Sequence, residues 1–231
     1  MKMNERIMIG NIPALLWGKP SDRVYLHVHG KMSRKEYAEH FASVAEEKGF
    51  QTLSFDLPEH GERSGSGERC EVWNGMRDLN AAADYAFARF KEVSLFACSI
   101  GAYFALNALA DRKLRKCLFQ SPIVDMEWLV RHMMLWSGVT ERQLEAEGEI
   151  ETPIDTLRFD YYRYILSHPV RSWPHPTSVL YAGQDNLQPR ASIDSFCARF
   201  GANLTVSEQS EHPFMAESDF SIVDEWLRTH L

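Results

Sequence analysis

Val93-Ser94-Leu95-Phe96-Ala97-Cys98-Ser99-Ile100-Gly101 combines a strand-like apolar run with a serine that has a small residue two positions to either side. An apolar run leads, through a small-x-Ser-x-Gly pattern, into the helical run 103–109. The pattern predicts a strand, a sharp turn and a helix, with Ser99 at the tip of the turn. An ordinary buried strand-to-helix turn with an incidental serine fits the same letters, so the rest of the chain has to distinguish the two.

Length and composition predict one domain, residues 1–231, with a sizeable core. Of the 231 residues, 45% are hydrophobic and 25% are charged, which suits an apolar interior beneath a solvated surface. The net charge of -7 makes a nucleic-acid partner improbable, because the phosphate backbone attracts basic proteins. The expected partner is a small-molecule substrate.

The cysteines and the apolar segments bear on the compartment. Cysteine spacing shows no paired metal motif, so we expect no metal and no cofactor, and free thiols in a reducing cytoplasm are the simplest interpretation. The N-terminus lacks a signal-peptide pattern. The uncharged run 93–110 is better explained by a buried strand and helix than by a membrane span. The sequence therefore predicts a cytoplasmic protein without a membrane span.

Apolar runs alternate with helical patterns along the chain. Strands are expected over residues 7–9, 14–17, 24–28, 52–55, 93–96, 116–119, 177–182 and 204–206. Helices are expected over residues 34–48, with Ser33 as N-cap, and over 73–91, 103–109, 192–200 and 219–227. This alternation predicts an α/β fold, a mostly parallel sheet with helices on both faces.

Residues that could take part in catalysis or binding follow several of these strands. Ligands gather beyond the carboxyl ends of the strands in such a sheet, so these positions are expected to meet at one edge. In chain order they are His29-Gly30, the loop 56–65, Ser99, Asp185 and His212.

On these features the chain resembles the α/β-hydrolase fold family. The resemblance is to its compact esterases, its monoacylglycerol-lipase-like enzymes and its serine aminopeptidase-like members, and it covers nearly the whole chain. The order Ser, Asp, His is the order of the family's triad, and small-x-Ser-x-Gly is a variant of its nucleophile elbow. Three positions depart from the family's pattern, in which glycine is common at each: Ala97, Glu59 and Glu211. None of these departures removes a reacting group.

The chemistry of acyl transfer requires a nucleophile, a base, a group that orients the base and donors for the oxyanion, and the sequence offers a candidate for each. A serine hydroxyl is a weak nucleophile, so Ser99 needs a base, for which His212 is the candidate, and Asp185 can orient that base. Two backbone N–H groups should stabilise the oxyanion, that of Ile100 after the nucleophile and, as the resemblance implies, that of Lys31.

Other side chains compete for these roles. Asp125, after the strand at 116–119, is the rival acid, and Asp185 is preferred because of the Gly183 turn before it. Cys98 is improbable as a nucleophile because its side chain should face the core. His29 and His60 are interpreted as structural hydrogen-bonding residues of their loops.

Residues 122–173 form the remaining segment, which we interpret as a helical cap inserted before the strand that carries Asp185. Its aromatic and methionine side chains should mostly pack the cap onto the body, while a few line an apolar acyl pocket. The candidates for that pocket are Trp128, Met133, Trp136 and Tyr161.

The sequence thus favours a serine hydrolase that cleaves a carboxylic ester, or a thioester, of a small apolar acyl group. An aminopeptidase or acyl-peptide hydrolase is the alternative enzyme, and it should need a clamp for a free amine or carboxylate. A catalytically silent binding member of the same fold is the alternative of a different class.

Overall fold

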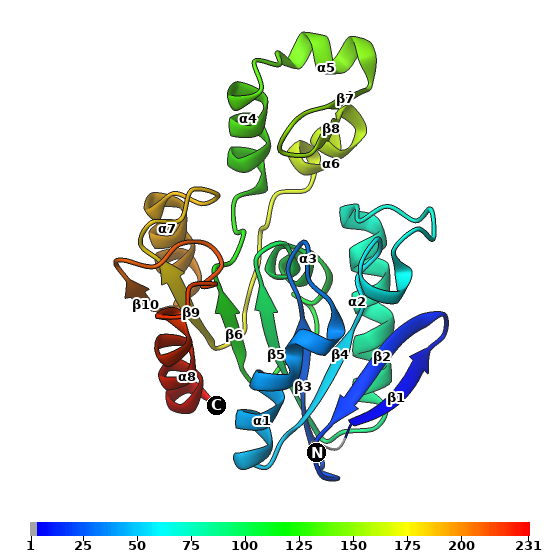
Figure 1. The fold of residues 1–231 in the computed structure, drawn as a ribbon, viewed down its shortest axis with the longest axis vertical. Helices are drawn as coiled ribbons and strands as arrows, with labels where there is room; N and C mark the ends of the chain where they lie inside the picture. Colours follow the sequence, from blue (N-terminus) through cyan, green and yellow to red (C-terminus); the bar gives the residue numbers. More distant parts are fainter. Residues whose placement is uncertain (1–3) are drawn as a thin grey trace.

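An eight-stranded sheet forms the centre of the molecule (Figure 1), in the computed structural model that describes residues 4–231. Its strands lie in the order β1-β2-β4-β3-β5-β6-β9-β10, with β1 and β2 antiparallel to their neighbours and all other pairs parallel. The mostly parallel sheet predicted from the sequence is confirmed. The strands are β1 (Asn4–Ile9), β2 (Ile12–Trp17), β3 (Arg23–Val28), β4 (Gln51–Phe55), β5 (Glu92–Cys98), β6 (Cys117–Gln120), β9 (Thr177–Ala182) and β10 (Asn203–Ser207).

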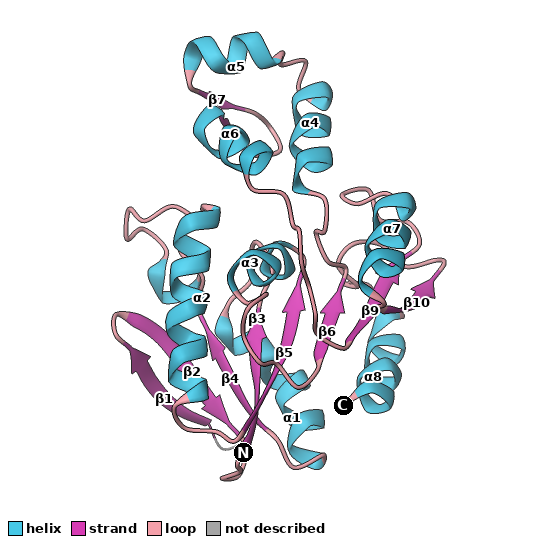
Figure 2. Cartoon of the chain, turned by 180° about the vertical axis from the view of Figure 1, so that it is seen from behind, coloured by secondary structure: helices cyan, strands magenta, loops and turns pink. Residues whose placement is uncertain are grey.

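Helices cover both faces of this sheet (Figures 1 and 2). One face packs against α1 (Glu39–Glu47) and α8 (Asp219–His230). The other face packs against α2 (Val72–Phe87), α3 (Ile100–Ala108) and α7 (Arg190–Phe200). Side chains of the central strand β5 alternate between the two cores: Leu95 and Ala97 enter the core beneath α2 and α3, and Phe96 enters the core beneath α1 and α8.

The segment between β6 and β9 stands beyond the carboxyl ends of the strands (Figure 1). We call this segment, residues 122–173, the insertion. Its elements are α4 (Met126–Trp136), α5 (Glu141–Glu147), a small antiparallel hairpin of β7 (Glu149–Glu151) and β8 (Thr156–Arg158), and α6 (Phe159–Ser167). Across residues 4–231, no helix combines the length and the apolar character needed to cross a membrane.

The first predicted helix begins differently from expectation. Residues 34–48 divide into a 3₁₀ helix, η1 (Lys35–Ala38), and then α1, and Ser33 caps neither of them. The Lys35 backbone N–H instead donates to Asp56 Oδ1 at 2.9 Å. The prediction of a Ser33 cap was wrong because a carboxylate from the loop after β4, distant in sequence, satisfies the first free N–H.

Helix α2 also differs from its prediction, since it ends at Phe87 rather than near residue 91. The Lys91 N–H donates to the Asp22 carbonyl at 2.8 Å, which draws the chain out of the helix and into β5.

A buried charge cluster holds the start of η1 against the loop after β4. Lys35 Nζ lies 2.7 Å from Asp56 Oδ2, and the two side chains are 1% and 0% exposed. The ammonium also lies 2.7 Å from Glu62 Oε1 and 2.9 Å from Glu36 Oε1. Burial by itself lowers the pKa of Lys35, but hydrogen bonds to the three carboxylates outweigh it and raise that pKa.

Removing the Lys35 ammonium should lower the free energy of unfolding far more than removing the ammonium of a surface lysine. Lys35→Met leaves Asp56 as a buried carboxylate without its counter-charge, so we expect the free energy of unfolding to fall by about 3 kcal/mol. Lys19→Met, at an 80% exposed side chain 3.9 Å from Glu46, is the matched control, with a change of about 0.5 kcal/mol or less. Urea unfolding of both variants tests this, and equal losses would contradict the account.

Candidate active site

Ser99 occupies a strained turn between β5 and α3. Its φ of 52° and ψ of -123° lie outside the regions that side chains normally adopt, and the residue is only 7% exposed. The turn brings the start of α3 against the end of β3: a Cβ added at Gly101 would lie 2.6 Å from the His29 carbonyl oxygen. The turn thus needs the glycine that the sequence supplies two positions after the serine.

Loops after β5, β9 and β10 bring three predicted site residues together. Ser99 Oγ lies 2.9 Å from His212 Nε2, and His212 Nδ1 lies 2.8 Å from Asp185 Oδ2. The His212 and Asp185 side chains are 7% and 0% exposed. With Asp185 ionised, Nδ1–H donates to the carboxylate and Nε2 is left to accept the serine proton. The arrangement is therefore capable of activating a hydroxyl for nucleophilic attack.

Backbone donors hold Asp185 in this orientation. Its Oδ1 accepts the N–H groups of Leu187 at 2.8 Å and Gln188 at 3.0 Å, which leaves Oδ2 for the histidine. The β9 and β10 loops pass closely at Gly183, where an added Cβ would lie 2.6 Å from the Glu208 Cα atom.

In the described chain, residues 4–231, neither competing residue forms a hydrogen bond or an ion pair with His212. Asp125 is the N-cap of α4: its Oδ1 accepts the Trp128 N–H at 2.9 Å, and its Oδ2 accepts the Ser192 hydroxyl at 3.2 Å. Burial raises the pKa of the Cys98 thiol to about 12, so this thiol stays protonated and unreactive at neutral pH.

Two buried histidines brace the loops after β3 and β4 against each other. His29 Nδ1–H donates to the Gly30 carbonyl at 2.7 Å, and His29 Nε2 accepts the Leu57 N–H at 3.1 Å. His60 Nδ1–H donates to the Pro58 carbonyl at 2.7 Å, and its Nε2 accepts the Met32 N–H at 3.0 Å. Both rings accept at Nε2, so both are neutral in this arrangement.

This brace orients the peptide that carries the Lys31 N–H. Because N–H and C=O point in opposite directions across a trans peptide, fixing the Gly30 carbonyl on the His29 ring turns the Lys31 N–H away from that ring. The loop passes beside the serine, since a Cβ added at Gly30 would lie 3.0 Å from the Ser99 Cβ. Within residues 4–231, the N–H groups of Lys31 and Ile100 donate no hydrogen bond and are available to a ligand.

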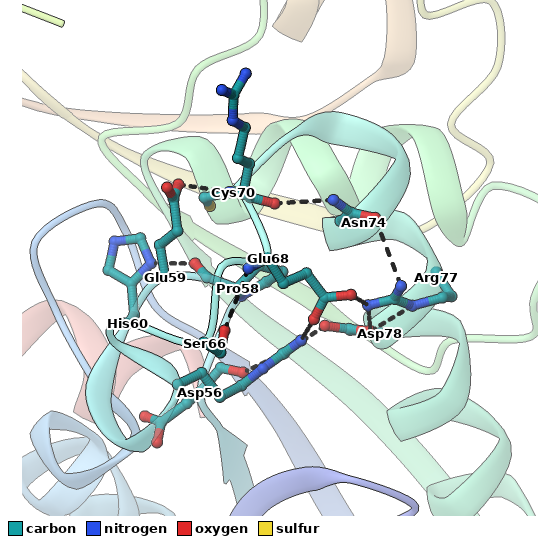
Figure 3. A network of polar contacts seen from close by, with 12 residues as sticks. Asp56, Pro58, Glu59, His60, Ser66, Glu68, Cys70, Asn74, Arg77 and Asp78 are labelled. Atoms are coloured by element: carbon teal, nitrogen blue, oxygen red, sulfur yellow. Dashed lines mark hydrogen bonds and ion pairs between the residues drawn. The ribbon is translucent and has the colours of Figure 1, made fainter. Parts of the chain in front are cut away.

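Glu59 has a structural reason to depart from glycine. Its φ is 65°, a value that glycine tolerates best, yet its carboxylate accepts the Cys70 N–H at 2.6 Å and so closes the loop 59–70 (Figure 3). Deeper in the same loop, Arg63 bonds to Asp78 and Glu68, and Arg77 Nη2 lies 2.6 Å from Glu68 Oε1. This network was not predictable from the sequence, because its members are separated along the chain and form no local pattern.

The four predicted pocket residues lie on two helices of the insertion. On α4, Trp128 stacks on His132 with ring centroids 3.6 Å apart, and Met133 is half-buried. Trp136 is 45% exposed and forms a T-shaped pair with Trp128. On α6, Tyr161 faces Trp73 of α2 at 6.2 Å, and burial raises the pKa of its hydroxyl well above the usual range. In residues 4–231 no hydrogen bond or ring contact joins any of the four to Ser99.

Ion pairs connect the insertion to the loops of the body. Lys31, on the loop beside Ser99, pairs with Asp155 of the β7–β8 hairpin. Arg69 Nη1 lies 2.7 Å from Glu149 Oε2, which is also 3.2 Å from Arg158 Nε. In the described part of the chain, no group of three or more His, Cys, Asp or Glu side chains is placed to hold a metal ion.

The buried His29 should make stability depend on pH. Burial lowers its pKa to about 4 in the folded protein, against about 6.5 in the unfolded chain, so the unfolded state binds the proton first as pH falls. Stability is therefore full above about pH 6.5 and is lost as pH falls toward 4, by about 2 kcal/mol between pH 7 and pH 5 for this group.

Urea unfolding at pH 7 and pH 5 measures that loss. His29→Gln should reduce the difference between the two pH values, whereas His168→Gln, at an exposed position, should leave it unchanged. An undiminished difference in His29→Gln would show that this histidine is not held neutral by the fold.

No known family model and no curated protein matches the chain. Solved structures do. Est1E from Butyrivibrio proteoclasticus, with ferulic acid bound, superposes with a TM-score of 0.80 at 17% identity, over 97% of this chain and 96% of that chain. Mouse alpha/beta hydrolase domain-containing protein 10 gives a TM-score of 0.79 at 14% identity, over 98% and 97% of the two chains. The monoacylglycerol lipase of Paleococcus ferrophilus gives 0.68 at 16% identity, over 96% and 100%.

Proposed function

Since this chain has the α/β-hydrolase fold, we propose that it is a serine hydrolase that cleaves a carboxylic ester, or a thioester, of a small apolar acyl group. The observation that carries the proposal is the continuous hydrogen-bonded series from Ser99 Oγ through the His212 ring to the buried Asp185. A hydroxyl, a base and an orienting carboxylate in this geometry serve acyl transfer on several unrelated folds.

In the proposed mechanism His212 Nε2 takes the Ser99 proton as Oγ attacks the carbonyl carbon. Asp185 holds the ring in the required tautomer and stabilises the imidazolium that forms. The N–H groups of Lys31 and Ile100 receive the negative oxygen of the tetrahedral intermediate. The imidazolium then protonates the leaving alcohol, and a water molecule activated by the same histidine releases the acyl group from Ser99.

The insertion, residues 122–173 of a single domain, is proposed to act as a cap that selects the acyl group. Support comes from its place beyond the carboxyl ends of the strands (Figure 1). Further support comes from its apolar side chains on α4 and α6. Trp128, Met133, Trp136 and Tyr161 are the proposed pocket residues. Ferulic acid in the Est1E structure supports including an aromatic acyl group among the substrates to be tried.

We also propose a cytoplasmic location. All four cysteines carry free thiols, which suits a reducing compartment.

Loss of the nucleophile tests the proposal. Ser99→Ala should lower kcat toward p-nitrophenyl butyrate by roughly 10⁴-fold or more, and His212→Ala should do nearly the same, because each removes a member of one catalytic unit. Ser94→Ala, on the same strand, is the matched control and should keep wild-type kcat. Full activity in Ser99→Ala would remove the whole mechanism.

A second pair of variants tests whether Asp185 or Asp125 is the acidic residue of the triad. Asp185→Asn should impair kcat strongly, because an amide can hold the ring in the wrong tautomer. Asp125→Asn should keep activity, since asparagine is also a good N-cap for α4. The reverse result would assign the acid to Asp125.

Substrate choice should follow acyl length. Each buried methylene contributes at most about 0.8 kcal/mol, so kcat/KM should rise by no more than about fourfold per methylene until the pocket is full. Trp128→Ala should move the preferred length in a panel of acyl esters, and Phe220→Ala, at an exposed position on α8, should not. A flat response with a strong preference for a free amine or carboxylate would favour a peptidase.

A further inference from the structure

A closed circuit of hydrogen bonds runs through the candidate triad and returns by way of the insertion. From Ser99 Oγ it passes through His212 to Asp185, whose Oδ1 accepts the Gln188 N–H at 3.0 Å. The Gln188 side chain then bonds to residues 124 and 125, and the neighbouring Ile123 N–H donates to the Ser99 carbonyl at 3.1 Å. Gln188 supplies the single side chain of this return path.

The Gln188 amide makes every hydrogen bond that a primary amide can make. Its Oε1 accepts the N–H groups of Val124 at 2.9 Å and Asp125 at 2.8 Å. Its Nε2 donates to the carbonyls of Asp125 at 3.1 Å and Leu187 at 2.8 Å. The residue is 0% exposed. A fully satisfied buried amide fixes the relative position of the groups around it, whereas an apolar side chain there would leave them unpaired away from water.

The backbone of Gln188 is equally constrained. Its N–H is one of the two donors to Asp185 Oδ1, and its carbonyl accepts the Tyr181 hydroxyl at 2.9 Å. The side chain, through residues 124 and 125, therefore determines where the backbone donor to Asp185 lies. Those two residues lead directly into α4, so the same amide joins the Asp185 loop to the first connection of the insertion.

We infer that Gln188 is a positioning residue for the reaction proposed above: it acts through Asp185, and it ties the orientation of that carboxylate to the entry of the insertion. The inference rests on the proposed function. It predicts that loss of the amide bonds lets the Asp185 loop shift and weakens the hold of the carboxylate on the His212 ring. Substrate binding, which does not use this path, should change little.

The test is a double-mutant cycle on the full chain with p-nitrophenyl butyrate. Gln188→Met keeps the length and volume of the side chain but loses its four hydrogen bonds, and it should lower kcat by about 10- to 100-fold with KM nearly unchanged. In the Asp185→Ala background the same substitution should cost less than about twofold, because the group through which it acts is already absent.

Gln51→Met is the matched control. Gln51 is also buried, at 8% exposure, but at the opposite end of the sheet, where its amide bonds to Ser21 and Gly18. It should lose stability without losing kcat. If Gln188→Met does not fold, Gln188→Asn, which keeps a neutral amide but draws it back by one methylene, takes its place and should show a smaller loss of kcat that again disappears in Asp185→Ala.

Two outcomes overturn the inference. A wild-type kcat in the Gln188 variants would show that the amide does not position Asp185. An equal fold-loss with and without Asp185 would show that its role is general to the structure. Failure of the proposed function is distinguished by Ser99→Ala, which would then hydrolyse the ester at the wild-type rate whatever Gln188 does.

Discussion

Hydrogen bonds from neighbouring segments hold the backbone of Ser99 in a strained conformation. A φ of 52° at a residue with a side chain costs on the order of 1–3 kcal/mol and persists only where neighbouring bonds impose it. Here the Ser99 N–H donates to the Gln120 carbonyl, and the Ser99 carbonyl accepts from Ala102 and Ile123. Strand β6 and the entry to the insertion thus hold the turn from both sides.

Both neutral and charged side chains hold the loops around the serine. Gln120 Nε2 donates to the Pro213 carbonyl at 2.9 Å beside His212, Gln188 secures the Asp185 loop, and His29 secures the Gly30 peptide. Lys35 and Arg63 hold the loop after β4 by ion pairs. The proposed mechanism uses the charge of Asp185, whose loop the neutral Gln188 holds.

The sequence was sufficient for the fold and for the choice of strand ends, because apolar periodicity and the Ser99 pattern are local signals. The mostly parallel sheet is confirmed, and Ser99, His212 and Asp185 lie together where three strands end. Partnerships between distant residues were not predictable: Asp56 replaces Ser33 at the start of η1, and Gln188 joins a segment 63 residues away. A single glutamine between Leu187 and Pro189 belongs to no sequence pattern from which this link could be predicted.

The most direct measurement is the site of covalent labelling by a fluorophosphonate. The wild-type protein is reacted with the probe, digested, and the modified peptide is identified by mass spectrometry. The proposed mechanism predicts one adduct per chain, on Ser99, because His212 accepts the serine proton as Oγ attacks the probe. No adduct at neutral pH, or an adduct on another residue with Ser99 unmodified, would contradict it.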